Sequence, residues 1–257
     1  MGVFADLARS GFGFFGLDVR KKKNVPPQGA GFDAILRKYL PDNPVIFDVG
    51  ANQGQSIDRF KKDFRNPVIH SFEPIKHECD KLKAIYANDP DVFLNNCAVG
   101  ESDGEKEFHI AEKTGSSSFN KLKKDSEWIR QRSKQVNTTP EKYVKSVEVV
   151  KVVTLDKYCA DKNIQKIDLL RIDTQGYEDM VLKGGLGFLA AGKVDAVLTE
   201  IMFDDVYEKY FNFSDIEKCL VPNDFRMVGI DLVNNSLFSG IVFWADVLYF
   251  RKKRFGI

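Results

Sequence analysis

Short apolar segments alternate with helix-like segments from residue 45 to the end of the chain. The segments that predict strands are 45–49, 68–72, 92–94, 167–172 and 194–198, with closing strands at 225–230 and 247–250. Between them, apolar residues recur at helical spacing, as at Ile75, Cys79, Leu82 and Tyr86. This alternation is typical of βαβ units around a parallel sheet. The pattern therefore predicts an α/β fold with a doubly wound sheet.

Two regions depart from the alternation. Residues 1–30 contain aromatic residues, glycines and a basic cluster, and predict a weakly helical arm, which a short helix over 32–40 follows. The arm either packs on the main domain or contacts an anionic membrane surface peripherally, since aromatic residues beside Lys and Arg suit an interface. Residues of about 112–147 are polar and rich in Lys and Ser, between β-like segments at 107–110 and 149–153. Long insertions in compact domains are often lids, so we expect a substrate-side insertion.

Length and composition agree with this division. The 257 residues suit one α/β domain with additions, which we place at 45–257 with the insertion at about 112–147, after an arm and short helix at 1–44. Lys and Arg (38) nearly balance Asp and Glu (37), so we expect no nucleic-acid partner. The four cysteines form no C-x-x-C pair, which argues against a zinc knuckle or redox pair. With neither a secretory signal nor an apolar stretch of about 20 residues, a cytoplasmic location is expected.

The most informative motif is the glycine turn after the first predicted strand, Asp48-Val49-Gly50-Ala51-Asn52-Gln53-Gly54. Doubly wound sheets bind ligands at the carboxyl ends of their strands, so this turn is placed for a nucleotide-like cofactor. A dinucleotide would bring its pyrophosphate toward the Asp48 carboxylate, which would repel it. S-adenosylmethionine has no phosphate and carries an ammonium and a sulfonium, which a carboxylate attracts. We therefore predict S-adenosylmethionine, with Asp48, Gly50, Asn52 and Gly54 as contacts.

Further cofactor contacts are expected after the second and third strands. Glu73 follows the second strand about 20 positions after the glycine turn, where a carboxylate can accept hydrogen bonds from both ribose hydroxyls. Its alternative role is an ordinary carboxylate at a helix start. Asn96 and Cys97 follow the third strand and are placed by topology near the adenine edge.

Five motifs in the same order resemble the FkbM-type methyltransferases. They are DVGANQG at 48–54, HSFEP at 70–74, NCAVGESDGE at 96–105, TLD at 154–156 and LLRIDTQGYEDMVLKG at 169–184. The resemblance implies a Rossmann-like class I methyltransferase fold with a mostly parallel seven-stranded sheet, and O-methylation of sugars or other secondary metabolites by S-adenosylmethionine. Asp48, Gly50 and Glu73 match the family's cofactor positions. Many members have Lys-Ile-Asp-Val-Glu-Gly where this chain has Arg171-Ile172-Asp173-Thr174-Gln175-Gly176, so no acid/base role carries over to position 175.

Methyl transfer to an alcohol benefits from a general base beside the sulfonium. Asp173, at the end of the fourth core strand, is the first candidate, with a helix N-cap as its alternative role. Glu200, just after the fifth strand, and His109, before the insertion, are the others. The segment 115–118 can order a loop over the ligand or form an ordinary Ser-rich turn. Asp173 with Asp204 and Asp205 could bind a divalent cation, but a solvated acidic pair explains 204–205 equally, and we predict no metal.

Two other functions remain as alternatives. A nicotinamide-dependent oxidoreductase could use the same fold, although Asp48 and the glycine spacing argue against it. A non-catalytic adenosyl-binding module would keep the glycine turn and Glu73 without an acceptor site. For the enzyme, we expect a small-molecule or carbohydrate acceptor. Its specificity is expected to come from the insertion and from the aromatic-rich segment 201–213.

Overall fold

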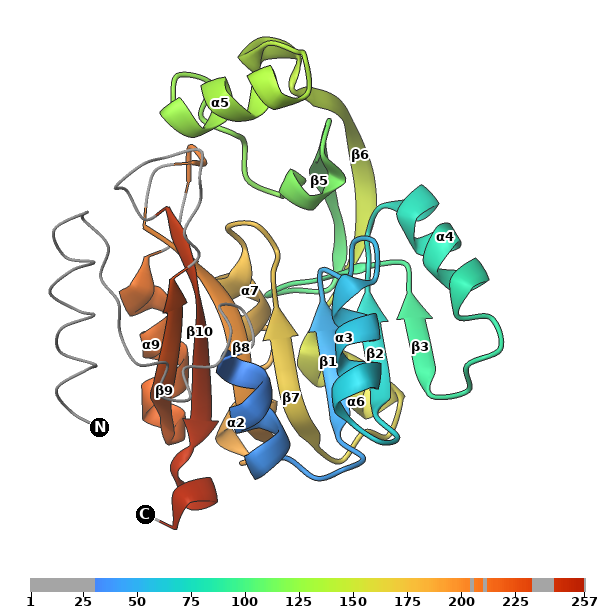
Figure 1. Ribbon diagram of the computed structural model, residues 1–257, viewed down its shortest axis with the longest axis vertical. Coiled ribbons are helices and arrows are strands. Elements are labelled where there is room, and N and C mark those ends of the chain that lie inside the picture. Colours follow the sequence, from blue (N-terminus) through green and yellow to red (C-terminus); the bar gives the residue numbers. More distant parts are fainter. Residues whose placement is uncertain (1–30, 204–205, 210–211, 233–242, 257) are drawn as a thin grey trace, which may run out of the picture.

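The computed structural model describes residues 31–203, 206–209, 212–232 and 243–256, so the predicted arm at 1–30 lies outside the described residues. One sheet has seven strands in the order β3-β2-β1-β7-β8-β10-β9 (Figure 1). The strands are β1 (Val45–Val49), β2 (Val68–Phe72), β3 (Val92–Asn95), β7 (Ile167–Ile172), β8 (Val194–Met202), β9 (Phe225–Leu232) and β10 (Trp244–Arg251). Neighbours from β3 to β8 pair in parallel, and β10 is antiparallel to β8 and β9. The predicted α/β fold with a mostly parallel seven-stranded sheet is confirmed.

Helices cover both faces of this sheet. On one face, α2 (Gly31–Tyr39) and α3 (Gln55–Asp63) bury Leu36 and Phe60 against sheet residues such as Ile46 and Leu248. On the other face lie α6 (Leu155–Asp161), α7 (Glu178–Lys183), α8 (Leu186–Ala190) and α9 (Phe213–Leu220). Helix α4 (Lys76–Ile85) follows β2 and lies beside β3 at the edge of the sheet (Figure 1). Burial of both sheet faces explains why the strands are nearly continuous apolar runs.

The predicted β-like segments around the insertion form a second, three-stranded sheet. It consists of β4 (Ala98–Val99), β6 (Val144–Val153) and β5 (Gly104–Ala111), in the order β4-β6-β5. Between β5 and β6 lie η1 (Thr114–Ser116), α5 (Glu127–Gln135) and η2 (Pro140–Lys142). Figure 1 shows α5 and β5 beyond the ends of the main strands. The remaining 3-10 turns are η3 (Val221–Asn223) and η4 (Lys252–Phe255).

The topology fixes where a ligand can bind. Strands β1 and β7 are neighbours, although the chain leaves β1 toward β2 and reaches β7 only after the second sheet. Strand order therefore reverses at the β1–β7 pair, and ligands of such sheets bind at the strand ends beside that point. All four cysteines are buried and free. None of the helices in the described ranges has the length and apolar composition needed to cross a bilayer.

Candidate active site

The glycine turn brings the end of β1 against the end of β7. Gly50 has φ +90°, and a Cβ on it would lie 2.0 Å from the carbonyl oxygen of Asp173. A side chain is therefore excluded by both backbone conformation and space. Gly54 (φ +87°) precedes α3, and a Cβ there would lie 2.8 Å from Leu82. The turn is completed when the Gly50 and Ala51 N–H groups donate to the carbonyl of Phe72.

Asp48 lies beneath this turn and is fully buried. Its partners in the sheet register are Ser71 on β2 and Arg171 on β7. One carboxylate oxygen accepts from Ser56 Oγ at 2.6 Å, and the other lies 3.1 Å from an Arg171 Nη. The Asp48 side chain thus ties β1, α3 and β7 together beneath the turn. Direct contact between Asp48 and the cofactor stays a prediction.

A pocket that we call the first pocket opens beside the turn, with a volume of about 70 Å³. Its polar lining includes Asn52, Glu73 and Asp173. The apolar lining consists of Val49, Phe72, Pro74, Ile75, Ala98, Val99, Phe108 and Phe119. A mostly apolar pocket with a few convergent polar groups is the usual form of a small-molecule site.

Glu73 is the buried acid of the first pocket, with 5% of its surface exposed. Its two oxygens accept from the backbone N–H groups of Asn52 and Ile75, both at 2.8 Å. Burial raises the Glu73 pKa to about 7, although the two N–H donors favour the ionised form. Each carboxylate oxygen keeps a second lone pair, so Glu73 can still accept hydrogen bonds from a ligand.

The predicted adenine contacts after β3 are arranged differently from the expectation. Asn96 donates its side-chain amide to the carbonyls of Glu73 and Pro74, both at 3.0 Å, and Cys97 is buried in the core. Neither lines the first pocket, whereas the next residues, Ala98 and Val99, do. These two residues form the short strand β4.

The Ser-rich segment that begins the insertion closes over the first pocket. Thr114 Oγ1 donates to the Asn52 side chain at 2.9 Å, and Ser118 Oγ donates to the backbone carbonyl of Gln175 at 2.7 Å. Thr114, Gly115 and Ser117 line the pocket. Of the two roles considered for this segment, a loop over the ligand site fits its position.

The end of β7 gathers the predicted base candidates around Gln175. The Gln175 amide nitrogen lies 2.8 Å from an oxygen of Asp173 and 2.9 Å from an oxygen of Glu200. Arg171 also pairs with Asp173. Glu200 lies within β8, which continues to Met202, and not after the strand as predicted. Burial, followed by the charge of Asp173, raises the Glu200 pKa well above its usual range.

A third carboxylate, Glu178, lies beside this pair. Oxygens of Asp173, Glu178 and Glu200 all lie within 4.8 Å of one another, which is close enough for a shared cation. Glu178 accepts from the backbone N–H groups of Thr174 at 2.7 Å and Gly176 at 3.0 Å. These donors, Gln175 and Arg171 already serve the three carboxylates, so we assign no metal to them. Asp204 and Asp205 lie outside the described residues.

His109, the third predicted base, does not lie with Asp173 and Glu200. It lies on β5, where its backbone N–H donates to the carbonyl of Ser118 at 2.9 Å. The neighbouring Phe108 lines the first pocket, but His109 does not, because successive strand residues point to opposite faces. Burial and Lys121 lower the His109 pKa. The base candidates that the fold brings together are therefore Asp173 and Glu200.

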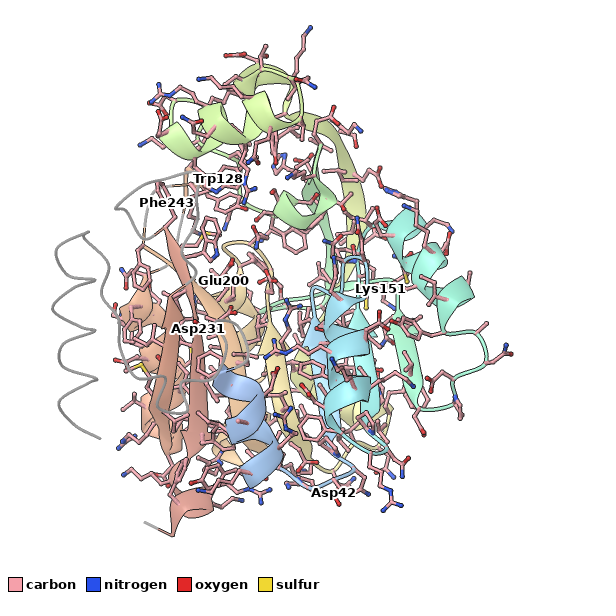
Figure 2. All side chains as sticks on the ribbon, in the orientation of Figure 1. Asp42, Trp128, Lys151, Glu200, Asp231 and Phe243 are labelled. Carbon is pink, nitrogen blue, oxygen red and sulfur yellow. The ribbon has the colours of Figure 1, made fainter. Side chains whose placement is uncertain are left out.

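A second cavity of about 130 Å³ adjoins the first pocket and shares Gly115 and Gln175 with it. Its other lining residues are Ser116, Trp128, Arg132, Glu200, Met202, Val206 and Trp244. Figure 2 labels Trp128 on the α5 side and Glu200 on the sheet side. The insertion was predicted from the sequence to contribute to specificity, but Arg132 and Trp244 were not singled out. The spacing of four residues between Trp128 and Arg132 was the available signal.

Among the described aromatic residues of the predicted segment 201–213, Tyr207 contacts the site. It is buried, and its hydroxyl lies 3.5 Å from the side-chain oxygen of Gln175. Phe203 is 45% exposed, and Phe213 packs against the core. Tyr210 and Phe211 lie outside the described residues.

Comparison with known proteins identifies the family. Residues 48–227 match the model of the methyltransferase FkbM domain. The chain is 27% identical over 182 residues to the 2-O-methyltransferase NoeI of Sinorhizobium fredii strain NGR234, covering 68% of this chain and 69% of NoeI.

Similar solved structures are methyltransferases. A 1,6-didemethyltoxoflavin N1-methyltransferase from Burkholderia thailandensis, with bound S-adenosylhomocysteine, has a TM-score of 0.46 and 14% identity, covering 96% of this chain and 88% of that one. Magnesium protoporphyrin IX methyltransferase from Synechocystis PCC 6803, with bound S-adenosylmethionine, has a TM-score of 0.46 and 11% identity, covering 96% of both chains. On the match to the family model, the chain belongs to the FkbM methyltransferases.

Proposed function

We propose that this methyltransferase transfers the methyl group to a hydroxyl oxygen of a small, sugar-like acceptor. The observation that carries the proposal is the meeting of two cavities at Gln175, with the carboxylates of Asp173 and Glu200 at the junction. The 2-O-methyltransferase activity in the name of NoeI supports the same assignment.

The cofactor is assigned to the first pocket. Glu73 accepts hydrogen bonds from the ribose hydroxyls, and Gly50 and Asn52 bring the backbone close to the nucleoside. Apolar residues such as Phe72 and Phe108 flank the adenine. Asp173, Glu178 and Glu200 place three acidic groups near the β7 end, with Arg171 as their neighbouring cation. A cationic sulfonium beside these groups would favour their ionised forms.

The reaction is an in-line displacement. The acceptor oxygen forms a bond to the methyl carbon while the bond from sulfur to that carbon breaks, and the sulfonium becomes a neutral thioether. The hydroxyl proton passes to the carboxylate of Asp173 or Glu200. Gln175 donates to both carboxylates and holds them in place, while alignment of oxygen, carbon and sulfur supplies much of the acceleration.

Glu73→Gln tests the cofactor site. A carboxamide has only one acceptor oxygen, and its NH₂ group would face the two backbone donors, so S-adenosylhomocysteine affinity should fall by about tenfold or more. Isothermal titration calorimetry measures this, with the exposed Glu105→Gln as the control. Unchanged affinity in Glu73→Gln would remove the ribose assignment.

The acceptor atom is tested with S-adenosylmethionine carrying a ¹³C-labelled methyl group. Incubation with monosaccharides and sugar acids should give a product whose labelled carbon has the chemical shift of a methyl ether. Label on nitrogen, or bound cofactor with no transfer to any hydroxylated compound, would contradict O-methylation.

A further inference from the structure

Arg132 is held between the two indole rings of the second cavity. Trp128 and Arg132 are four residues apart on α5 and so lie on one face of the helix. The guanidinium carbon of Arg132 is 5.5 Å from the Trp128 ring centroid and 5.9 Å from that of Trp244 on β10. These are cation–π distances, and both rings attract the guanidinium to this wall of the cavity.

The charge of Arg132 is not neutralised by its described neighbours. Among the described residues, its guanidinium donates one side-chain hydrogen bond, to the neutral Gln135 oxygen at 3.1 Å. Within the described ranges, no carboxylate forms an ion pair with Arg132, and its buried Nε has no hydrogen-bond partner. By contrast, Arg130 on the same helix pairs with Glu127 at 3.1 Å. An unpaired guanidinium lining a cavity is suited to bind an anion.

The second cavity therefore has two chemically different ends. Arg132 and the indoles form one wall, on α5 and β10, and Gln175 and Glu200 form the wall that adjoins the first pocket. Figure 2 shows Trp128 and Glu200 on these two sides. A ligand with an anionic group and a hydroxyl group would place the anion at Arg132, because Arg132 is the cationic residue among those that line this cavity.

We propose that the acceptor carries an oxyanion, a carboxylate or a phosphate ester, which Arg132 binds while a hydroxyl of the same molecule faces Gln175 and Glu200. This rests on the proposed function, since it assigns the second cavity to the acceptor. Arg132 is then a specificity-determining residue. It selects acidic sugars over neutral ones and orients the ring so that one hydroxyl faces the methyl donor.

The two indoles provide the measurement, because Trp128 and Trp244 are the only tryptophans in the chain. Intrinsic tryptophan fluorescence thus reports on the surroundings of Arg132. The protein, with and without S-adenosylhomocysteine, is titrated with glucuronate, glucose 6-phosphate and glucose. Glucuronate and glucose 6-phosphate distinguish a carboxylate from a phosphate, and glucose is the neutral control.

At least one charged sugar should give a saturable fluorescence change, with glucose binding at least tenfold more weakly. Arg132→Gln should abolish the preference for that charged sugar, and Arg130→Gln should behave like the wild type. Arg132→Lys keeps the charge but loses the planar guanidinium, so its affinity for the charged sugar should lie between those of the wild type and Arg132→Gln. Circular dichroism of each variant checks folding.

Saturable binding that is equal for glucose and the charged sugars, or a preference that survives in Arg132→Gln, would overturn the inference. So would the absence of a saturable change with both charged sugars, which would leave Arg132 a structural link between the indoles. Loss of S-adenosylhomocysteine binding by calorimetry is a separate result that contradicts the proposed function and not the role of Arg132.

Discussion

Gly50 and Gln175 occupy facing turns at the ends of β1 and β7, and both have positive φ, +90° and +58°. Glycine adopts this conformation freely, but for a glutamine it costs about 1 kcal/mol. The cost at Gln175 is offset by the Ser118 hydroxyl on its carbonyl and by the two carboxylates on its amide. Strained residues of this kind concentrate at functional sites, in agreement with the place of Gln175 between the two cavities.

The variant Gly50→Ala tests whether position 50 needs a glycine because space is lacking or only because φ is positive. Its Cβ would meet the Asp173 carbonyl at 2.0 Å, so the β1 and β7 turns must move apart. We expect a loss of stability of about 2–4 kcal/mol and at least tenfold weaker S-adenosylhomocysteine binding. Gly192→Ala is the matched control, since Gly192 has φ +73° but nothing within 4 Å of an added Cβ.

Gly192→Ala should lose only about 1 kcal/mol of stability and should bind S-adenosylhomocysteine as tightly as the wild type. Urea denaturation and calorimetry measure the two quantities. Equal stability losses in the two variants would show that the contact with Asp173 contributes nothing beyond backbone strain.

The ion-pair partner of Asp48 could not be predicted from the sequence. The Asp48 carboxylate was predicted to attract a cationic cofactor, but it pairs with Arg171, which comes from a strand 123 positions away and also pairs with Asp173. Such pairing is non-local and has no motif. Three acidic groups lie together at Asp173, Glu178 and Glu200. The proposed attraction of a cationic cofactor therefore rests on these residues and not on Asp48 alone.

Among the elements, α5 carries the residues proposed to select the acceptor. Its N-cap is Ser126, whose hydroxyl accepts from the backbone N–H of Ile129 at 3.3 Å. Helix propensity and capping matter here because a helix of two to three turns is marginal without them. Loss of the cap should loosen the first turn and with it the position of Trp128.

Ser126→Ala should therefore lower stability by about 1 kcal/mol and weaken binding of the charged sugar by several-fold. Thr154→Ala is the control, because Thr154 caps α6, which packs on a face of the main sheet and not on the second cavity. It should cost similar stability and leave sugar affinity unchanged. If Ser126→Ala and Thr154→Ala weaken sugar binding equally, the loss of affinity comes from lower global stability and not from a change in α5.

Element bounds were predicted correctly where the apolar run is uninterrupted and were missed where polar residues occur within a strand. The bounds of β1, β2 and β7 were predicted as observed, because both faces of these strands are covered and their sequences are apolar throughout. Strand β6 begins at Val144, five residues before the predicted start, and its first half is mostly exposed. Strand β8 continues through Thr199 and Glu200. The strand was predicted to end at 198 because these two side chains are polar.

At the scale of the whole molecule, topology explains which part of the site was predictable. Glu73 and Asp173 follow core strands, so the rule for strand ends places them together. The second cavity combines α5 from the insertion with Trp244 from β10, which lie 116 positions apart between Trp128 and Trp244. No local pattern specifies that contact, since it depends on how the insertion packs over the end of β8.

The buried acids of the site also predict how the stability of the unliganded protein depends on pH. Burial raises the pKa of both Glu73 and Glu178 to about 7, against about 4.3 in an unfolded chain. The folded state then binds more protons, so stability is full at low pH and is lost as pH rises through 7. Burial lowers the pKa of His70 to about 4, which acts in the opposite direction, but only below its unfolded value of about 6.5.

Between pH 6.5 and 8 the glutamates therefore determine the sign, and the free energy of unfolding should fall by about 1–2 kcal/mol. Urea denaturation at several pH values measures this, and Glu73→Gln should remove about half of the fall. Saturating S-adenosylhomocysteine should also reduce it, because ribose hydroxyls that donate to Glu73 favour its ionised form and lower its pKa. Stability that is flat or rises over this range would mean that Glu73 and Glu178 are already ionised without a ligand.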